Sequence, residues 1–145
     1  MLFRSLAVLF VDLDQFKKIN DTHGHLIGDE VLQLVARRLE ASVRTSDTVS
    51  RFGGDEYLVL LTEISQASDA TLAAVKLLAA IAAPNRVKDG TVQLSASIGI
   101  AVYPGDGLDT ASLINRADEA MYRAKRQGGG GFEQATALSS KLLSS

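Results

Sequence analysis

The chain has 145 residues, 46% of them hydrophobic, which suffices for one domain with a buried core that needs no disulfide or metal to fold. Its net charge of -2 excludes a general basic surface for nucleic acid, and the absence of cysteine fits a reducing compartment. The apolar runs 6–11 and 72–83 are shorter than the about 18 residues that span a bilayer, which predicts a cytoplasmic domain whose parent protein could still be membrane-attached.

The first part of the chain predicts a strand followed by two helices. The apolar run 6–11 predicts a buried strand, and residues 16–21 predict a short helix. Residues 22–25 and Gly28 predict a turn. After it, apolar residues from Val31 to Val43 recur at helical spacing and predict a longer helix.

The remainder predicts a hairpin, a helix, a strand and a final helix. Two short strands, 48–52 and 57–61, flank a pair of glycines that favours a hairpin turn. The Ala-rich segment 67–83 predicts a helix, the alternating segment 92–102 a half-buried strand, and the apolar stripe 113–124 a helix. This order predicts an α+β fold with a central, mainly antiparallel sheet flanked by helices.

Acidic residues follow the first strand and lie in the predicted hairpin. Asp12 and Asp14 end the strand, and Asp55 and Glu56 follow the glycine pair. If the two strands are neighbours, these carboxylates meet at one edge of the sheet, where they could hold Mg²⁺ together with a substrate phosphate. The same acids are also common turn residues, so the residues alone leave both interpretations open.

Several spaced motifs together resemble one known family. The segment Arg51-Phe-Gly-Gly-Asp-Glu-Tyr57 resembles the signature of the GGDEF family, the diguanylate cyclases, with Tyr57 in place of the usual Phe. Segments 10–21, 23–29, 97–101 and 116–125 are similar to further family motifs in the same order. The resemblance implies a palm-like GGDEF domain over residues 1–131, without the usual first helix, and a flexible tail over 132–145.

The resemblance also implies a metal and catalytic centre. Its Mg²⁺ (or Mn²⁺) ligands would be the side chains of Asp12 and Asp55 and the carbonyl of Leu13. The signature hairpin would supply the catalytic residues Gly53, Gly54, Asp55 and Glu56. Glu56 would assist the centre either as a base or as a metal partner.

Five residues are implied to bind the substrate, GTP. Asn20 and Asp29 would read the guanine edge, for which an amide and a carboxylate are suitable partners. Phe16, Lys17 and Lys125 would contact the nucleotide, the lysines as point charges near phosphate. Without the resemblance, Asp29 is an acid at a helix start, Phe16 a core residue and each lysine a solvated charge. His23 and His25 lack the further ligand that a zinc site needs.

An inhibitory site for the product, cyclic di-GMP, is implied by Arg44 and Asp47. They match the family's Arg-x-x-Asp site, and Arg51 is placed to add a third contact. Arginine and aspartate are suited to the guanine edges and phosphates of such a ligand. Outside this family the same pair would be an ordinary ion pair at the end of a helix.

The resemblance implies a homodimeric enzyme that condenses two GTP molecules into cyclic di-GMP, attached to a regulatory or sensory region further towards the N-terminus. Gly129 stands where the family has an arginine that helps to neutralise the triphosphate, and Arg126 should point elsewhere on its helix. This departure keeps a second hypothesis open, an inactive module that binds GTP or cyclic di-GMP. A third hypothesis, a cyclase that uses ATP as one substrate, is disfavoured by Asp29.

Overall fold

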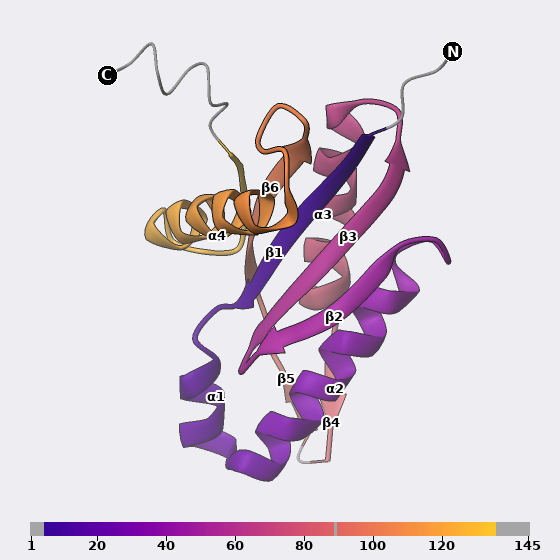
Figure 1. The fold of residues 1–145 in the computed structure, drawn as a ribbon. Coiled ribbons are helices and arrows are strands. Elements are labelled where there is room, and N and C mark those ends of the chain that lie inside the picture. The colour runs from indigo at the N-terminus through magenta and orange to yellow at the C-terminus, as the bar shows by residue number, and fades with distance from the viewer. Residues whose placement is uncertain (1–4, 89, 136–145) are drawn as a thin grey trace.

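A five-stranded sheet with helices on both faces forms the domain in this computed structural model, which describes residues 5–88 and 90–135 (Figure 1). The strands in spatial order are β2 (Thr48–Gly53), β3 (Glu56–Ile64), β1 (Ser5–Leu13), β6 (Ala96–Tyr103) and β7 (Phe132–Gln134). Neighbouring strands run antiparallel except β6 and β7, which are parallel. The predicted α+β fold is confirmed, with one parallel pair in an otherwise antiparallel sheet.

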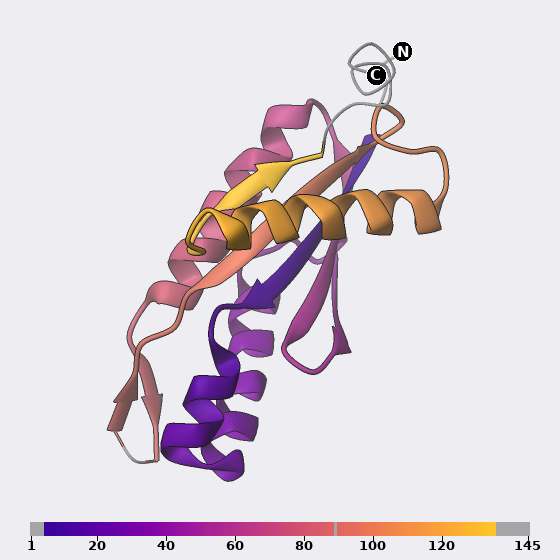
Figure 2. The same cartoon turned by 90° about the vertical axis from the view of Figure 1, so that its left-hand side faces the viewer.

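The helices divide between the two faces of the sheet (Figure 2). Helices α2 (His25–Ala41) and α3 (Ala67–Ala82) pack on one face, and α4 (Thr110–Arg126) crosses the other. Helix α1 (Phe16–His23) extends from the lower end of β1 and packs against α2. Strands β4 (Asn85–Val87) and β5 (Gly90–Val92) form a separate small hairpin, which contacts α2 through β4.

Strand β1 is central because both of its faces are apolar. Its alternate residues Ala7, Leu9, Val11 and Leu13 face the larger core shared with α2 and α3, whereas Val8 and Phe10 face the smaller core under α4. This period of two is the geometry of an extended strand. Burial on both sides fixes the register of β1, and with it the position of Asp12 opposite Glu56 near the end of the strand.

The predicted turn at Gly28 is wrong. Helices α1 and α2 are separated by Gly24 alone, whose φ of 88° is a conformation that glycine adopts easily. Gly28 lies inside α2 and is buried. The glycine is therefore needed for close packing within the helix rather than for a reversal of the chain.

The predicted strand 92–102 also differs from the structure. Residues 90–92 belong to β5, and β6 begins only at Ala96. From Ala96 to Ala101 every residue is buried, because α3 and α4 cover opposite faces of β6. The expectation of a half-buried strand is therefore wrong.

The predicted flexible tail begins too early. Its first residues, Phe132–Gln134, form β7 and pair with Ile98, Gly99 and Ile100 of β6. Residues 136–145 of the predicted tail lie outside the described residues. Within the described ranges, no helix is both long and apolar enough to cross a bilayer.

Candidate active site

The hairpin between β2 and β3 brings three acidic residues together at the lower end of the sheet. Strand β3 pairs with β1 so that Glu56 lies opposite Asp12, and the Leu13 amide donates to the Asp55 carbonyl at 3.2 Å. The turn itself begins at Gly54, whose positive φ of 45° suits a residue without Cβ. The adjacency of these strands, on which the sequence prediction depended, is therefore present.

Two of the carboxyl groups are held in an unfavourable electrostatic environment. Burial, followed by the charge of Asp55, raises the pKa of Asp12 to about 7. Burial also raises the pKa of Glu56, with further contributions from the charges of Asp118 and Asp55. A cation bound among these oxygens would stabilise their charged forms. Asp118, on α4, was not predicted from the sequence, because its separation from Glu56 along the chain carries no local signal.

Lys125 lies beside these acids. Its Nζ is 3.7 Å from Asp12 Oδ1, 3.1 Å from Asp14 Oδ1 and 3.2 Å from the Leu13 carbonyl oxygen. Lys125 belongs to the last turn of α4, so the packing of that helix on the sheet carries the ammonium group to the end of β1. The family resemblance implies that this lysine contacts phosphates, and in the structure it lies beside the carboxylates.

Asp14, two residues after Asp12, accepts four hydrogen bonds. Its donors are the Ser95 and Ser97 hydroxyls, each at 2.7 Å, the Gly130 amide at 2.8 Å and the Lys125 ammonium at 3.1 Å. Burial acts to raise the pKa of Asp14, but the hydrogen bonds outweigh it and the pKa is lowered. Asp14 is therefore an ionised anchor whose oxygens are already occupied by donors.

Gly129, the departure from the family pattern, packs against the Asp14 side chain. A Cβ added to Gly129 would lie 2.7 Å from Asp14 Oδ2, and the φ of this residue is 74°. An arginine at this position would therefore require both a strained backbone and a displaced Asp14. Arg126 does not replace it, because its guanidinium lies 5.3 Å from the centre of the exposed Tyr122 ring.

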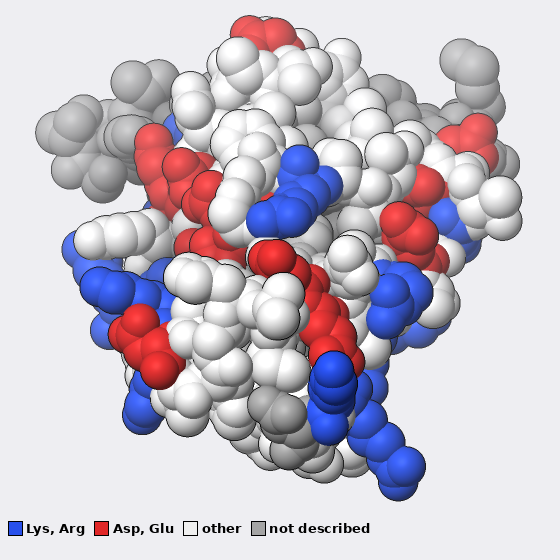
Figure 3. All heavy atoms as spheres, turned by 90° about the horizontal axis from the view of Figure 1, so that it is seen from below, with Lys and Arg blue, Asp and Glu red and all other residues white. Residues whose placement is uncertain are grey.

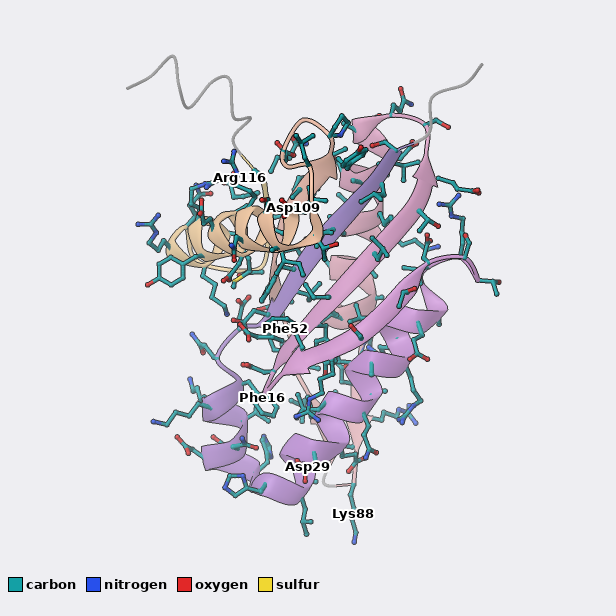
Figure 4. All side chains as sticks on the ribbon, viewed as in Figure 1. Phe16, Asp29, Phe52, Lys88, Asp109 and Arg116 are labelled. Carbon is teal, nitrogen blue, oxygen red and sulfur yellow. The ribbon has the colours of Figure 1, made fainter. Side chains whose placement is uncertain are left out.

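The predicted guanine-binding residues meet where α1 packs against α2. The Asn20 side chain lies so close to Gly28 that an added Cβ would be 1.8 Å from its Oδ1, and Phe16 Cζ would be 3.3 Å away. Asp29 follows Gly28 directly and is exposed. Figure 4 shows Phe16 towards the hairpin end of the sheet and Asp29 lower, near the start of α2. Lys17 is exposed on α1.

The donor set at the hairpin fits a small divalent cation. Asp12 and Asp55 offer carboxylate oxygens and Leu13 a carbonyl oxygen, which are the hard ligands that Mg²⁺ and Mn²⁺ prefer. Among residues 5–88 and 90–135, no group of three or more His, Cys, Asp or Glu side chains has the geometry of a metal site. The lower end of the molecule carries acidic and basic side chains close together (Figure 3).

Arg44 and Asp47 form a separate site just beyond the end of α2. The Asp47 side chain is 3% exposed and accepts from the Arg44 amide at 3.0 Å and the Thr62 amide at 3.0 Å. The Arg44 side chain is 58% exposed and its Nε lies 3.3 Å from Asp47 Oδ2. The pair borders a hollow of about 370 Å³ that Lys76 of α3 also lines. Lys76 was not predicted from the sequence, because it lies in another helix, far from Arg44 along the chain.

Arg51 does not contact Arg44 or Asp47 in the structure. It lies opposite Tyr57 near the hairpin turn, and its Nε donates to the Gly54 carbonyl at 2.9 Å. Thr62, which touches Asp47, is five residues further along β3, or about 16 Å at the rise of a strand. The structure therefore assigns Arg51 to the hairpin and not to the predicted inhibitory site.

Tyr57, the departure within the signature motif, is fully buried. Its hydroxyl donates to the Leu32 carbonyl of α2 at 2.7 Å, and burial raises its pKa to about 12. A buried hydroxyl with a partner is not destabilising. The tyrosine in place of phenylalanine therefore adds a hydrogen bond between the hairpin and α2 without disturbing the core.

Comparison with known proteins agrees with this geometry. A family model described as the diguanylate cyclase GGDEF domain matches residues 3–131. Over 129 residues, or 89% of this chain, the chain is 50% identical to the bifunctional diguanylate cyclase/cyclic di-GMP phosphodiesterase MucR of Pseudomonas aeruginosa. It is 46% identical to the diguanylate cyclase TpbB of the same species, over 95% of this chain. The chain spans 19% and 32% of the lengths of these two curated relatives.

Solved structures show the same fold. The crystal structure of the GGDEF domain of TpbB from Pseudomonas aeruginosa has a TM-score of 0.89 at 47% identity, covering 92% of this chain and 83% of that one. The coiled coil and GGDEF domain of DgcB from Caulobacter crescentus, solved in complex with c-di-GMP, has a TM-score of 0.82 at 25% identity. That match covers 91% of this chain and 70% of the DgcB chain.

Proposed function

The chain belongs to the GGDEF family of diguanylate cyclase domains, and from this premise we propose that it condenses two GTP molecules into cyclic di-GMP. The observation that carries the proposal is the meeting of Asp12, Asp55 and Glu56 at the hairpin end of the sheet. This end adjoins α1, whose Asn20 packs on α2 beside Asp29. One surface thus offers both a place for phosphates and a place for a guanine.

Guanine is held by Asn20 and Asp29 in this proposal. The Asp29 carboxylate accepts from the N1 and N2 donors of the base, and the Asn20 amide can both donate and accept. Adenine lacks that pair of donors on the same edge, so Asp29 favours GTP over ATP. Phe16 packs beside the Asn20–Gly28 contact and helps to fix the position of the base.

The reaction joins the 3′-hydroxyl of one GTP to the α-phosphate of the other. A phosphorus–oxygen bond forms there, the bond between the α- and β-phosphates breaks, and pyrophosphate leaves; the second linkage forms in the same way. Asp12, Asp55 and the Leu13 carbonyl would hold Mg²⁺ or Mn²⁺, which supplies positive charge to the triphosphate. Glu56, with its raised pKa, is suited to accept the proton of the hydroxyl.

The reaction needs two chains, because each chain has one surface that binds one GTP molecule. A homodimer that places two surfaces face to face would align each hydroxyl with the phosphate of the opposite nucleotide. Arg44 and Asp47 lie away from this surface and form the proposed inhibitory site for cyclic di-GMP. The exposed Arg44 fork is suited to a phosphate or to guanine O6 and N7, and Lys76 adds a second positive charge at the same hollow.

The decisive experiment is incubation of the purified chain with GTP and Mg²⁺ at high protein concentration, with mass-resolved detection of cyclic di-GMP. We expect product from the chain and none from Asp55→Ala/Glu56→Ala. ATP offered alone should give no cyclic dinucleotide. A folded chain that binds GTP but forms no product would refute the proposed enzymatic activity. Loss of cyclic di-GMP binding in Arg44→Ala, with GTP binding kept, would support the separate inhibitory site.

A second candidate function is a binding module without turnover. Gly129 favours it, because the arginine that the family has there to assist the triphosphate is absent, and a side chain at this position would have to displace Asp14. Such a module would bind GTP or cyclic di-GMP and act through a partner protein. The same assay separates the two candidates, since the module binds nucleotide with a measurable affinity but yields no pyrophosphate.

A further inference from the structure

The ammonium group of Lys125 contacts two of the three groups proposed as metal ligands. Its Nζ donates to the Leu13 carbonyl oxygen at 3.2 Å and forms an ion pair with Asp12 Oδ1 at 3.7 Å. Both oxygens are hard, negatively polarised ligands of the kind that a divalent cation needs. The lysine therefore presents a positive charge to the same atoms that the metal would use.

This position of Lys125 is built by the fold. The lysine extends from the last turn of α4, and its side chain is only 26% exposed. Asp14 also accepts from the ammonium at 3.1 Å and is itself fixed by Ser95, Ser97 and Gly130. Four separate segments of the chain thus cooperate to keep one positive charge at the end of β1.

We propose that the Lys125 ammonium and the divalent cation compete for the Asp12 and Leu13 oxygens, so that metal binding releases Lys125 towards the phosphates. This inference rests on the proposed metal site. Two cations cannot share these oxygens without strong mutual repulsion at such short range. Asp14 also contacts the ammonium, at 3.1 Å, and can retain the lysine near the site after it leaves Asp12. Lys125 is then a positioning residue that couples metal entry to phosphate contact.

The first test measures binding of Mn²⁺ alone, without nucleotide, by the electron paramagnetic resonance signal of the free ion. Lys125→Gln should bind Mn²⁺ on the order of tenfold more tightly than the unaltered chain, because the competing charge is gone. Lys18→Gln is the matched control: it removes the same charge from an exposed position on α1 and should change the affinity less than about twofold. Thermal unfolding of both variants establishes that they fold.

The outcomes separate this inference from the proposed function. Equal Mn²⁺ affinity in Lys125→Gln and the unaltered chain, or an equal gain in Lys18→Gln, would overturn the competition while leaving the metal site in place. If neither the unaltered chain nor any variant binds Mn²⁺, even at millimolar concentration, the proposed metal site is refuted, and the inference that rests on it is refuted as well.

A second measurement uses the unaltered chain and does not depend on the stability of a variant. The lysine ammonium signals are recorded by nitrogen-15 NMR during a Mg²⁺ titration. A hydrogen-bonded Lys125 ammonium should give a slowly exchanging signal that moves or disappears as Mg²⁺ saturates the site. A Lys125 signal that stays unchanged at saturating Mg²⁺ would contradict the inference.

Discussion

Gly28 lies directly under the side chain of Asn20, and the contact leaves no room for a Cβ atom. In Gly28→Ala the new methyl group would force the Asn20 amide, which is the movable partner, out of its position. We expect GTP binding to weaken by about tenfold, the equivalent of one or two hydrogen bonds at about 1 kcal/mol each. Binding is measured by titration with a fluorescent GTP analogue.

The free energy of unfolding of Gly28→Ala should stay close to that of the unaltered chain, although its affinity for GTP falls. Alanine is the better helix former by about 1 kcal/mol, which offsets the strain of moving one side chain. The single variant Asn20→Ala and the double variant Gly28→Ala/Asn20→Ala complete a double-mutant cycle. If Gly28 acts through Asn20, the double variant binds GTP no worse than Asn20→Ala alone. Additive losses would mean that Gly28 acts independently of Asn20.

Asp47 provides a test of charge at the proposed inhibitory site. Burial acts to raise the pKa of this carboxyl, but hydrogen bonds from Thr62 and Arg44 outweigh it and lower the pKa. Its pKa is thus lower in the folded than in the unfolded chain, so its contribution to stability is present above about pH 4 and is lost as the pH falls through the folded-state value.

Asp47→Asn should therefore lower the free energy of unfolding at pH 7 by about 2 kcal/mol, the contribution of hydrogen bonds to a charged group. The difference from the unaltered chain should shrink as the pH falls below about 4. Urea unfolding across this range measures it, and Asp21→Asn, at an exposed position on α1, is the control. A loss of the same size at low and neutral pH would show that the charge of Asp47 is not its source.

At the level of whole elements, the contact between α4 and β6 decides where Lys125 and Asp118 lie. A Cβ on Gly99 of β6 would be 1.8 Å from the Ala117 carbonyl oxygen and 2.3 Å from the Met121 amide. These are backbone atoms of α4 and cannot move without the helix. Gly99→Ala should therefore lower the free energy of unfolding by about 3 kcal/mol, the upper range for overpacking.

Urea unfolding tests this prediction, with Gly105→Ala as the control, because a Cβ there meets nothing within 4 Å. The control should change stability by less than about 0.5 kcal/mol. In the folded fraction of Gly99→Ala the displaced helix should also carry the Lys125 ammonium away from Asp12. Unchanged stability would mean that α4 can shift along the sheet at little cost.

The elements that the sequence predicted well are those with a strong local signal. The apolar run of β1, the glycine pair of the hairpin and the periodic stripes of α2 and α4 each depend on nearby residues. Strands β4, β5 and β7 have three residues each and owe their conformation to partners elsewhere in the fold. The same limit applies to the site: Lys125 and Asp14 are 111 residues apart, and only the packing of α4 brings them together.

Across the whole molecule, helix α2 separates the proposed substrate and product sites. Asp29 lies near its start, and Arg44 follows its end at Ala41. The 17 residues of α2 span about 25 Å at the rise of an α-helix. Cyclic di-GMP at Arg44 therefore cannot block GTP by direct contact, and inhibition would have to act through α2 or through the approach of a second chain.

The need for a second chain gives the proposed reaction a distinct dependence on concentration. The acids that would hold the triphosphate gather at one end of one sheet, so a single domain presents one GTP. Where most of the protein is monomeric, doubling the chain concentration should raise the initial rate about fourfold, because the active species is the dimer. The rate is followed by pyrophosphate release at saturating GTP and Mg²⁺. Asp55→Ala chains added in excess should suppress it, since each mixed dimer lacks one metal ligand. A rate strictly proportional to concentration, unaffected by Asp55→Ala, would mean that one chain completes the reaction alone.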